Sequence, residues 1–478
     1  MKSSYFFPCA ILTLACLPPA LWANPPELEV KVATPDPRPQ AVRMVGNFAN
    51  FDPAELKTAT TKELRENPEL TRTLLNRVID SGQFHLLPDL LAIYRQTAQP
   101  DPILIDYSEA ILFGLRGEYR RGIALYQRIL AAHPDFDPVR FRLAQILFDD
   151  RQHRAAADHF RRLQAVRLPP QIATLTTQYL AAIAQRSQWQ FHFGVNYLQE
   201  NNVNNASADR YIYLGNVPFE KTPDSLPQKA HGLNYVFNAE KSINLVGSHY
   251  AKIENNFHGK TFWDNYAYDD QSDRLSVGYQ YLRAKTGVAL LPFYEMRWYG
   301  NHRYNRGYGV RGELNHWFSP KWQLSLAAER GELKHRAAEN RAADGHNLLL
   351  SATLLHLLNA NSYLYLGSDY LADRPREAAF GSDRKTVRLG WGQAWWGGIS
   401  SRVQLSYGKR DFLALHKLFL QVRHDKEWAA TLTLWKRDFY YWGITPKLTF
   451  SYNKVKSNLA QLYSTEKKRL FLSLEKAF

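Results

Sequence analysis

The sequence contains almost no cysteine. Among 478 residues only Cys9 and Cys16 carry a thiol, and both lie in the first twenty positions. If that segment is removed, the remaining chain has no disulfide, no thiolate nucleophile and no cysteine-ligated metal. Stabilisation by disulfides, catalysis by a cysteine and metal binding by cysteine are therefore excluded for the remaining chain.

Long apolar runs are also lacking. The mean hydropathy is −0.42 and 22% of the residues are charged, which argues against a bundle of membrane-spanning helices. Apolar residues make up 45% and aromatic residues 13%, so the chain is not disordered either. The formal net charge is +15, and the length allows about three domains, or fewer if one is a large β-barrel.

The first residues have the pattern of a secretory signal. Lys2 is followed by a mostly apolar stretch, and Ala23 suits cleavage before Asn24, so we assign residues 1–23 to the signal peptide. The alternative is a lipoprotein signal ending at Cys16, although Thr13 stands where such signals prefer leucine. Residues 24–53 are rich in proline and are predicted to be an extended linker.

Tryptophan divides the rest of the chain. None occurs between residues 24 and 188, whereas eleven of the twelve lie between Trp189 and Trp442. Residues 54–188 instead carry helix signals, such as Asn67 and Pro68 at a start and Gly82 after an end. The predicted fold class is therefore α+β with two domains, helical over 54–188 and β over 189–478.

The helical part contains a repeat with a period of 34 residues. Small and large residues recur in the order that lets antiparallel helices pack closely. The matched pairs are Ala110 with Ala144, Phe113 with Leu147, Gly122 with Ala156, Tyr126 with Phe160, and Ile129 with Leu163. This pattern resembles the tetratricopeptide repeat, although the usual tryptophan is missing.

Short solenoids of such repeats form grooves that bind peptides or proteins. We therefore take the repeat positions as the scaffold of a partner groove around Tyr126 and Phe160, although simple core packing explains each side chain equally well. The region is also cationic, which fits a solvated helix face, an acidic partner or lipid phosphate, but not nucleic acid in an exported chain. The arginines concerned are Arg116, Arg120, Arg121, Arg128, Arg151, Arg154, Arg161 and Arg162.

After Trp189 the apolar period changes to two, as expected for strands with one apolar face. Charged residues such as Arg297 and Arg388 fall on the polar face, where a wet lumen suits them better than a sandwich core. At roughly 20 residues per strand and turn, residues 189–478 form about 12 to 16 antiparallel strands, with about fourteen as the central prediction. The segment from Leu348 to Leu358 reads as a strand, being too short to span as a helix.

The chain ends inside an alternating strand. Leu470, Leu472 and Leu474 lie on one face and Phe478 is the last residue. This ending resembles the signal by which outer-membrane barrels are recognised by the barrel assembly machinery, although Lys476 departs from it. The predicted location is the bacterial outer membrane, with the helical domain in the periplasm.

Motifs for catalysis are not found in the sequence. Ser248 adjoins His249, but neighbours on a strand point to opposite faces, and no nucleophile elbow, zinc motif or phosphate loop occurs. A barrel hydrolase would have to assemble scattered groups, namely His192, His231, His249, His356, Asp269 and Asp270. We predict no enzyme, no cofactor and no metal.

Several stretches resemble the surface lipoprotein assembly modulators (Slam) of Gram-negative bacteria. They are the residues 142–144, 151–152, 155–160 and 168–171 in the helical part, and 319–323, 443–449 and 476–478 in the barrel. The resemblance implies a fourteen-stranded barrel with a repeat domain that moves lipoproteins to the cell surface. It also implies clients of the transferrin-, lactoferrin-, factor H- or haemoglobin-haptoglobin-binding kinds.

The expected partners are a client lipoprotein, outer-membrane lipid, the barrel assembly machinery and a periplasmic chaperone. The alternative function is an exopolysaccharide-export porin with a periplasmic repeat domain, although such proteins usually have longer repeat arrays. A passive porin or barrel enzyme leaves the repeat domain without a role.

Overall fold

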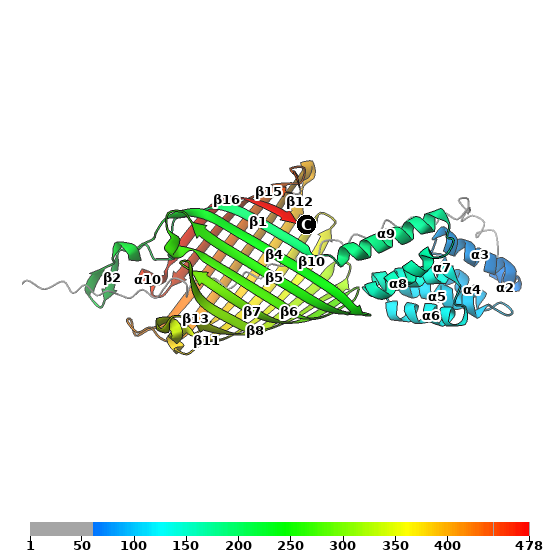
Figure 1. The fold of residues 1–478 in the computed structure, drawn as a ribbon, viewed down its shortest axis with the longest axis horizontal. Coiled ribbons are helices and arrows are strands. Elements are labelled where there is room, and N and C mark those ends of the chain that lie inside the picture. The colour runs from blue at the N-terminus through cyan, green and yellow to red at the C-terminus, as the bar shows by residue number, and fades with distance from the viewer. Residues whose placement is uncertain (1–60, 443, 478) are drawn as a thin grey trace, which may run out of the picture.

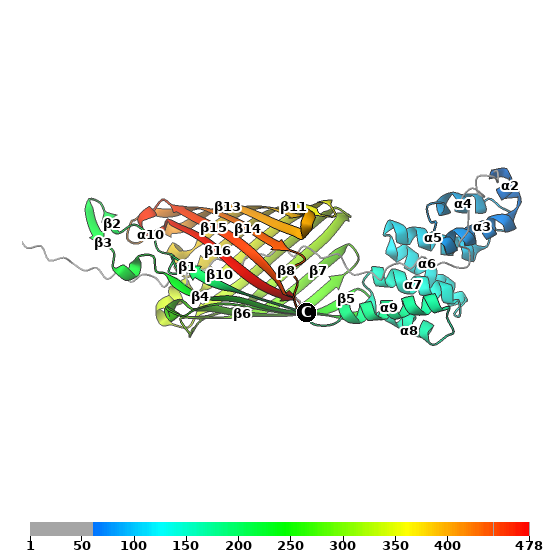
Figure 2. The same ribbon diagram turned by 90° about the horizontal axis from the view of Figure 1, so that it is seen from above.

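The computed structural model describes residues 61–442 and 444–477. The predicted signal peptide and linker, and the terminal Phe478, lie outside the described residues. The described chain consists of a helical domain at one end of a β-barrel, as Figures 1 and 2 show from two sides.

Eight α-helices occupy residues 61–186. They are α2 (Thr61–Glu66), α3 (Pro68–Ser81), α4 (Leu87–Tyr94), α5 (Pro102–Arg116), α6 (Tyr119–Ala132), α7 (Asp137–Asp149), α8 (His153–Gln164) and α9 (Pro170–Arg186). None of the described helices is long and apolar enough to cross a membrane.

Local sequence signals explain where these helices begin and end. The Asn67 side chain accepts a hydrogen bond from the Leu70 amide at 3.0 Å, and Pro68 takes the first helical position of α3. Gly82 ends the helix with a φ of 70°, a left-handed conformation that glycine adopts without a Cβ clash. Asp101 caps α5 in the same way, through the Ile103 amide at 2.8 Å.

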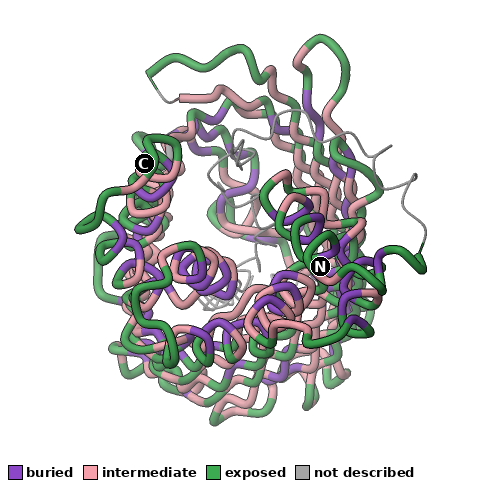
Figure 3. The backbone as a smooth tube through the Cα atoms, turned by 90° about the vertical axis from the view of Figure 1, so that its right-hand side faces the viewer, coloured by how far each residue is buried: buried purple, intermediate pink, exposed green. Residues whose placement is uncertain are grey.

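The repeat spacing brings α5 against α6 and α7 against α8 in one hydrophobic core. Small residues let the helices approach, because a Cβ at Gly122 would lie 2.6 Å from the Ile146 Cδ1 atom. Phe160 stacks on Tyr179 of α9 with ring centroids 4.8 Å apart, and Phe141 meets Phe160 edge to face. Figure 3 shows that burial is concentrated where the helices face one another.

Strands begin immediately after the helical domain. They are β1 (Gln190–Glu200), β4 (Ala230–Val246), β5 (His249–Phe262), β6 (Asp270–Leu282), β7 (Thr286–Tyr299), β8 (His302–Ser319), β9 (Trp322–His335), β10 (Gly345–Asn359), β11 (Ser362–Pro375), β12 (Ser382–Ala394), β13 (Ile399–Leu415), β14 (Val422–Lys436), β15 (Ile444–Ser457) and β16 (Thr465–Ala477). Two short strands, β2 (Tyr211–Leu214) and β3 (Val217–Glu220), form a hairpin in the loop after β1, and the helix α10 (Ala460–Tyr463) precedes β16.

These fourteen strands close into an antiparallel barrel in which β16 pairs with β1. The prediction of a barrel of about fourteen strands is confirmed, and the stretch from Leu348 to Leu358 lies within β10. Alternation places apolar side chains outward, for example Leu364 and Leu366 on β11, while charged side chains such as Asp369 face the lumen.

The two ends of the barrel differ. The β4–β5, β6–β7 and β8–β9 turns are two or three residues long and lie at the end where α9 joins β1 and where β16 ends. The opposite end carries the β2–β3 hairpin and α10. Outer-membrane barrels have short periplasmic turns and longer extracellular loops, so the helical domain lies at the periplasmic end.

Because the Phe160 ring is buried in the helical core, its removal should destabilise the helical domain and leave the stability of the barrel unchanged. Phe160→Ala should lower its free energy of unfolding by about 3 to 5 kcal/mol, because the cavity left between α7, α8 and α9 cannot collapse fully. The measurement is urea unfolding of the full chain, with far-ultraviolet circular dichroism for the helices and tryptophan fluorescence for the barrel. The control is Arg161→Ala, which changes the exposed neighbouring residue. Equal unfolding midpoints for the two variants would contradict the role of Phe160 in the helical core.

Candidate functional site

The repeat positions predicted to support a partner groove lie inside the helical core. Phe113 is half-buried, and the other seven are buried, namely Ala110, Gly122, Tyr126, Ala144, Leu147, Ala156 and Phe160. Their burial fits a scaffold role, in which they set how the helices pack. A protein bound to this domain would contact other side chains.

One candidate contact surface is a polar row across α7 and α9. The Arg142 guanidinium donates to the Gln145 side chain at 3.3 Å, and Gln145 donates to the Tyr179 hydroxyl at 3.2 Å. Arg142 also lies over the Phe84 ring, 5.5 Å from its centroid. Burial raises the pKa of Asp80, and the positive charge of Arg142 opposes that shift.

The arginines of the helical domain do not form a single cationic patch. Arg121 pairs with Glu118 at 2.8 Å and Arg161 with Asp158 at 3.1 Å. Arg128 donates to both carboxylate oxygens of Asp106 across α5 and α6. At Arg121, Arg128 and Arg161, the contacts therefore favour the interpretation as a solvated, ion-paired helix face over a site for an acidic partner or phosphate.

The helical domain is attached to the barrel through the turn between α7 and α8. Asp150, which is 1% exposed, accepts hydrogen bonds from Arg283 of the β6–β7 turn, with Nε to Oδ1 at 3.1 Å. The Tyr250 hydroxyl donates to the Arg151 carbonyl. Arg154 donates from its amide to Asn244 at 2.8 Å and from its guanidinium to the Leu245 carbonyl at 2.9 Å. We call these contacts the docking interface.

The same repeat position is used twice at this interface. Gly117 and Arg151 are 34 residues apart and both have left-handed backbone, with φ of 75° and 64°. A Cβ at Gly117 would lie 2.9 Å from the Lys285 ammonium group in the β6–β7 turn. The α5–α6 and α7–α8 turns, one from each repeat, therefore meet the β6–β7 and β4–β5 turns of the barrel, which fixes the orientation of the repeats.

An uncharged histidine fills the centre of the interface. Burial lowers the pKa of His153 to about 3, and the positive charges of Arg186 and Arg151 act in the same direction. Its ring packs edge to face against Phe148 and Tyr250, with centroids 5.7 Å and 6.2 Å away. His153 therefore lies between aromatic rings and the Arg186 guanidinium, 3.5 Å from its Nε2, and the Asp150–Arg283 ion pair lies at the same interface.

The lumen is lined by ion pairs between strands. Arg274 binds Glu329 with two bonds of 3.1 Å and 2.8 Å, and Arg388 binds Asp369 with bonds of 2.6 Å and 2.8 Å. Such two-pronged pairs are the strong ones, since each guanidinium matches the carboxylate geometry. The charges predicted to face a wet lumen do so, and they compensate one another across strands.

The groups considered for a hydrolase are engaged separately. His231 contacts the Tyr197 hydroxyl at 2.8 Å, His356 stacks on Trp322, and Asp270 pairs with Arg297. His192 lies 3.6 Å from Glu475, while Asp269 accepts from the Phe262 amide. No three metal-binding side chains cluster among the described residues.

The seam between β1 and β16 has the shortest ladder in the barrel. Among the described residues, five pairs join these strands, from His192 with Ala477 to Asn196 with Ser473. The neighbouring β1–β4 and β15–β16 ladders have eleven and twelve pairs. The five pairs lie in the periplasmic half, so the outer half of the seam lacks a backbone ladder.

Side chains bridge that outer half. The buried Glu200 carboxylate lies 3.5 Å from Lys467, 3.3 Å from Arg469 and 3.6 Å from Lys260. A cavity of about 230 Å³ adjoins this cluster and is lined by residues 200–202 and 466–469. Beyond it, Tyr213 of the β2–β3 hairpin donates to the Gln461 side chain of α10 at 2.9 Å, which ties together the loops on either side of the seam.

The predicted assembly signal lies on β16. Leu470, Leu472 and Leu474 are exposed on the outer face of the barrel, next to this seam. Their placement is compatible with recognition from the lipid side. Sequence analysis missed Glu200, Asp150 and Arg283, because each is defined by a partner on a distant segment.

Comparison with known proteins identifies relatives over nearly the whole chain. Residues 189–478 match the family described as "Surface lipoprotein assembly modifier", and residues 57–160 match its "N-terminal TPR repeats". "Surface lipoprotein assembly modifier 1" of Haemophilus influenzae is 36% identical and covers 90% of this chain and 89% of its own. "Surface lipoprotein assembly modifier 1" of Neisseria meningitidis serogroup B is 33% identical over 95% and 90% of the two chains.

The docking interface depends on the Asp150–Arg283 pair. Arg283→Ala should weaken docking by about 3 to 5 kcal/mol, because it leaves the Asp150 carboxylate buried without its partner. In a chain with Cys9 and Cys16 replaced, spin labels at positions 161 and 321 should give a narrow distance distribution that broadens in the variant.

The matched control is Arg336→Ala, which removes an exposed arginine at the far end of the barrel. Exchange of the two charges, Asp150→Arg with Arg283→Asp, should narrow the distribution relative to either single change. An Arg283→Ala distribution as narrow as that of the unmodified chain would refute the role of this pair.

Proposed function

The chain belongs to the surface lipoprotein assembly modifier family, and from that premise we propose that it moves lipoproteins across the outer membrane to the cell surface. The family consists of outer-membrane transporters, not enzymes. The observation that carries the proposal is the docking interface, which holds a repeat domain against the periplasmic turns of a closed barrel. Its clients are surface lipoproteins.

The helical domain is the receiving part in this proposal. It lies at the periplasmic end, where a lipoprotein anchored in the inner leaflet is within reach. The polar row of Arg142, Gln145 and Tyr179 offers hydrogen-bonding groups to an extended client segment or to a chaperone that carries the client. The barrel assembly machinery and outer-membrane lipid are the other proposed partners.

The β1–β16 seam is the proposed route for the lipid anchor. A lipoprotein has a polar body and acyl chains, and the chains are stable only in lipid. A path through the closed lumen would expose them to charged pairs such as Arg274–Glu329, whereas an opening in the barrel wall would leave them in the bilayer. Five backbone pairs of the described residues must separate at this seam.

The helical domain holds one side of that seam. Residues 187–189 alone separate α9 from β1, and the docking interface uses the turns that join β4 to β5 and β6 to β7. These strands follow β1 in the barrel on the side away from β16. A rotation of the helical domain on client binding would therefore move β1 and its neighbours relative to β16.

Surface exposure of a client tests the proposed function. A candidate surface lipoprotein, co-expressed with this chain, should become accessible to protease on intact cells and remain protected without it. Arg283→Ala should lower the exposed fraction while total client amount stays constant, because an undocked helical domain no longer delivers to the barrel. Unchanged exposure of every client tested would favour the polysaccharide-export alternative, which secreted polymer would then have to support.

A disulfide across the seam tests the route. Asn196→Cys with Ser473→Cys joins a register pair of β1 and β16, and should reduce client exposure by about tenfold under oxidising conditions, with recovery after reduction. The control pair Asn315→Cys with Ser325→Cys joins β8 to β9. If the seam disulfide forms and client display continues, the lipid anchor does not pass through the seam. That result would contradict the route and leave the proposed function of the protein untouched.

A further inference from the structure

Four lysines form one row across the outer face of the barrel. Lys385 is paired in register with Lys409, Lys409 with Lys426, and Lys426 with Lys456, on β12 to β15. All four side chains are exposed, and they share the outward face with Val387, Tyr407 and Trp428. At about 4.8 Å between strands, the row is about 14 Å long. We call it the lysine row.

The row has no partner at contact distance among the described residues, although the Asp383 carboxylate interacts with Lys385 through its charge. Like charges directly opposite on neighbouring strands are destabilising, yet none of the four lysines forms an ion pair or hydrogen bond with a described residue. The carboxylates one step nearer the extracellular end are engaged elsewhere. Asp383 pairs with Arg374 at 2.6 Å, and Asp411 with His424 at 2.7 Å.

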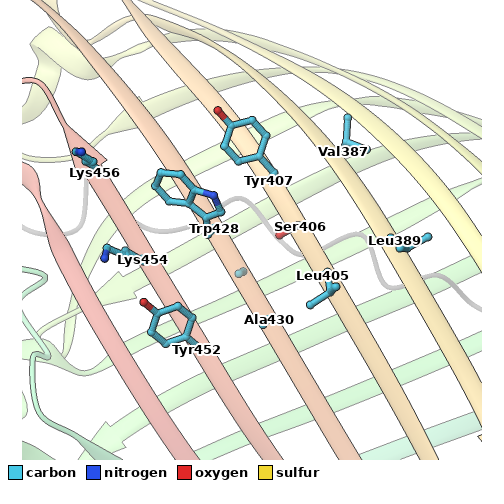
Figure 4. Close-up of a pocket in the computed structure, with 11 residues that line it drawn as sticks. Val387, Leu389, Leu405, Ser406, Tyr407, Trp428, Ala430, Tyr452, Lys454 and Lys456 are labelled. Atoms are coloured by element: carbon cyan, nitrogen blue, oxygen red, sulfur yellow. The ribbon is translucent and has the colours of Figure 1, made fainter.

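An apolar groove lies directly below the lysine row on the same outer face. Its walls are two further register rows, Val387 with Tyr407 and Trp428, and Leu389 with Leu405 and Ala430. The small Ala430 side chain, between Leu405 and Tyr452, makes the hollow, which has a volume of about 680 Å³. Figure 4 shows Tyr407, Trp428 and Tyr452 around it, with Lys454 and Lys456 on one side.

Position decides which ligand suits these features. The lysine row lies one to six residues from the extracellular ends of its strands. In outer-membrane barrels the outward apolar band ends toward these strand ends, where the acyl layer meets the headgroups. Lysine side chains at that depth extend toward anionic headgroups. A lipoprotein anchor carries acyl chains but no phosphate, so it would leave the row without a counter-charge.

We propose that the lysine row and the groove below it bind a phosphorylated glycolipid of the outer leaflet, of the lipid A class. The phosphates lie along Lys385, Lys409, Lys426 and Lys456, and an acyl chain occupies the groove over Ala430. A row of about 14 Å suits a headgroup with more than one phosphate better than a single phosphodiester. The site spans β12 to β15, so only β16 separates it from β1, and it differs from the client route in the phosphate that it binds.

Native mass spectrometry of the full chain in detergent tests the site, with bisphosphorylated lipid A as the probe. Lys409→Gln with Lys426→Gln should lower its affinity by about thirtyfold, since each lysine near a headgroup contributes about a factor of five. The control, Lys334→Gln with Lys241→Gln, removes two lysines on β9 and β4, outside the row and the groove, and should change affinity less than about twofold. Ala430→Trp fills the groove and should weaken binding while the lysine row is intact.

Competing lipids separate the sources of phosphate. Monophosphorylated lipid A should bind more weakly than the bisphosphorylated form, and phosphatidylglycerol more weakly than either. Equal binding of all three, or an equal loss in the control pair, would overturn the proposal. If the paired glutamine variant fails to fold, as judged by heat-modified gel mobility, an unchanged affinity in Ala430→Trp would overturn it instead.

Discussion

A chain that crosses lipid as strands must pair every backbone amide and carbonyl within the protein, and only a closed sheet does so. The rest of this structure depends on that closure. The barrel has fourteen contacts between paired strands. In thirteen of them the two strands follow each other along the barrel chain, whereas the β1–β16 seam joins its first and last strands. It is also the seam with the fewest backbone pairs, five among the described residues, so the barrel closes least strongly where the chain is least constrained by local turns.

Strand alternation gives each segment two environments, and the charges are sorted accordingly. Lumenal arginines such as Arg274 and Arg388 meet carboxylates on other strands, which compensates their burial in a polar interior. The four outward lysines form no ion pair with a described residue, and Lys385 has only a longer-range interaction with the Asp383 carboxylate. A charge without a partner on a lipid-facing wall is costly unless it reaches the headgroup layer. Charges on the lumenal face are therefore paired within the protein, whereas those on the outer face require lipid headgroups.

The sequence was sufficient for features with a local or periodic cause. Asn67, Pro68 and Gly82 mark the ends of α3 through single capping interactions, and a 34-residue period identifies the stacked helices. Alternation over residues 189–477 predicts the barrel and its approximate strand number. Glu200 could not be recognised, because its partners Lys467 and Arg469 lie more than 260 residues away on β16. Asp150 with Arg283, and the four strands of the lysine row, depend likewise on register and docking, which no local pattern encodes.

The position of the helical domain follows from the same topology. A domain joined to β1 by residues 187–189 could only dock near β1, and the nearest periplasmic turns on that side are those of β4–β5 and β6–β7. The docking interface uses both turns and extends no described contact to β16, which belongs to the other side of the seam. A force applied to the helices is therefore transmitted to β1 at the seam. On the other side of the seam, β16 is held by its twelve pairs with β15. Because Glu200, Lys467 and Arg469 close the outer half with side chains alone, that half can open and reclose without breaking backbone pairs, and the five periplasmic pairs determine the cost of opening.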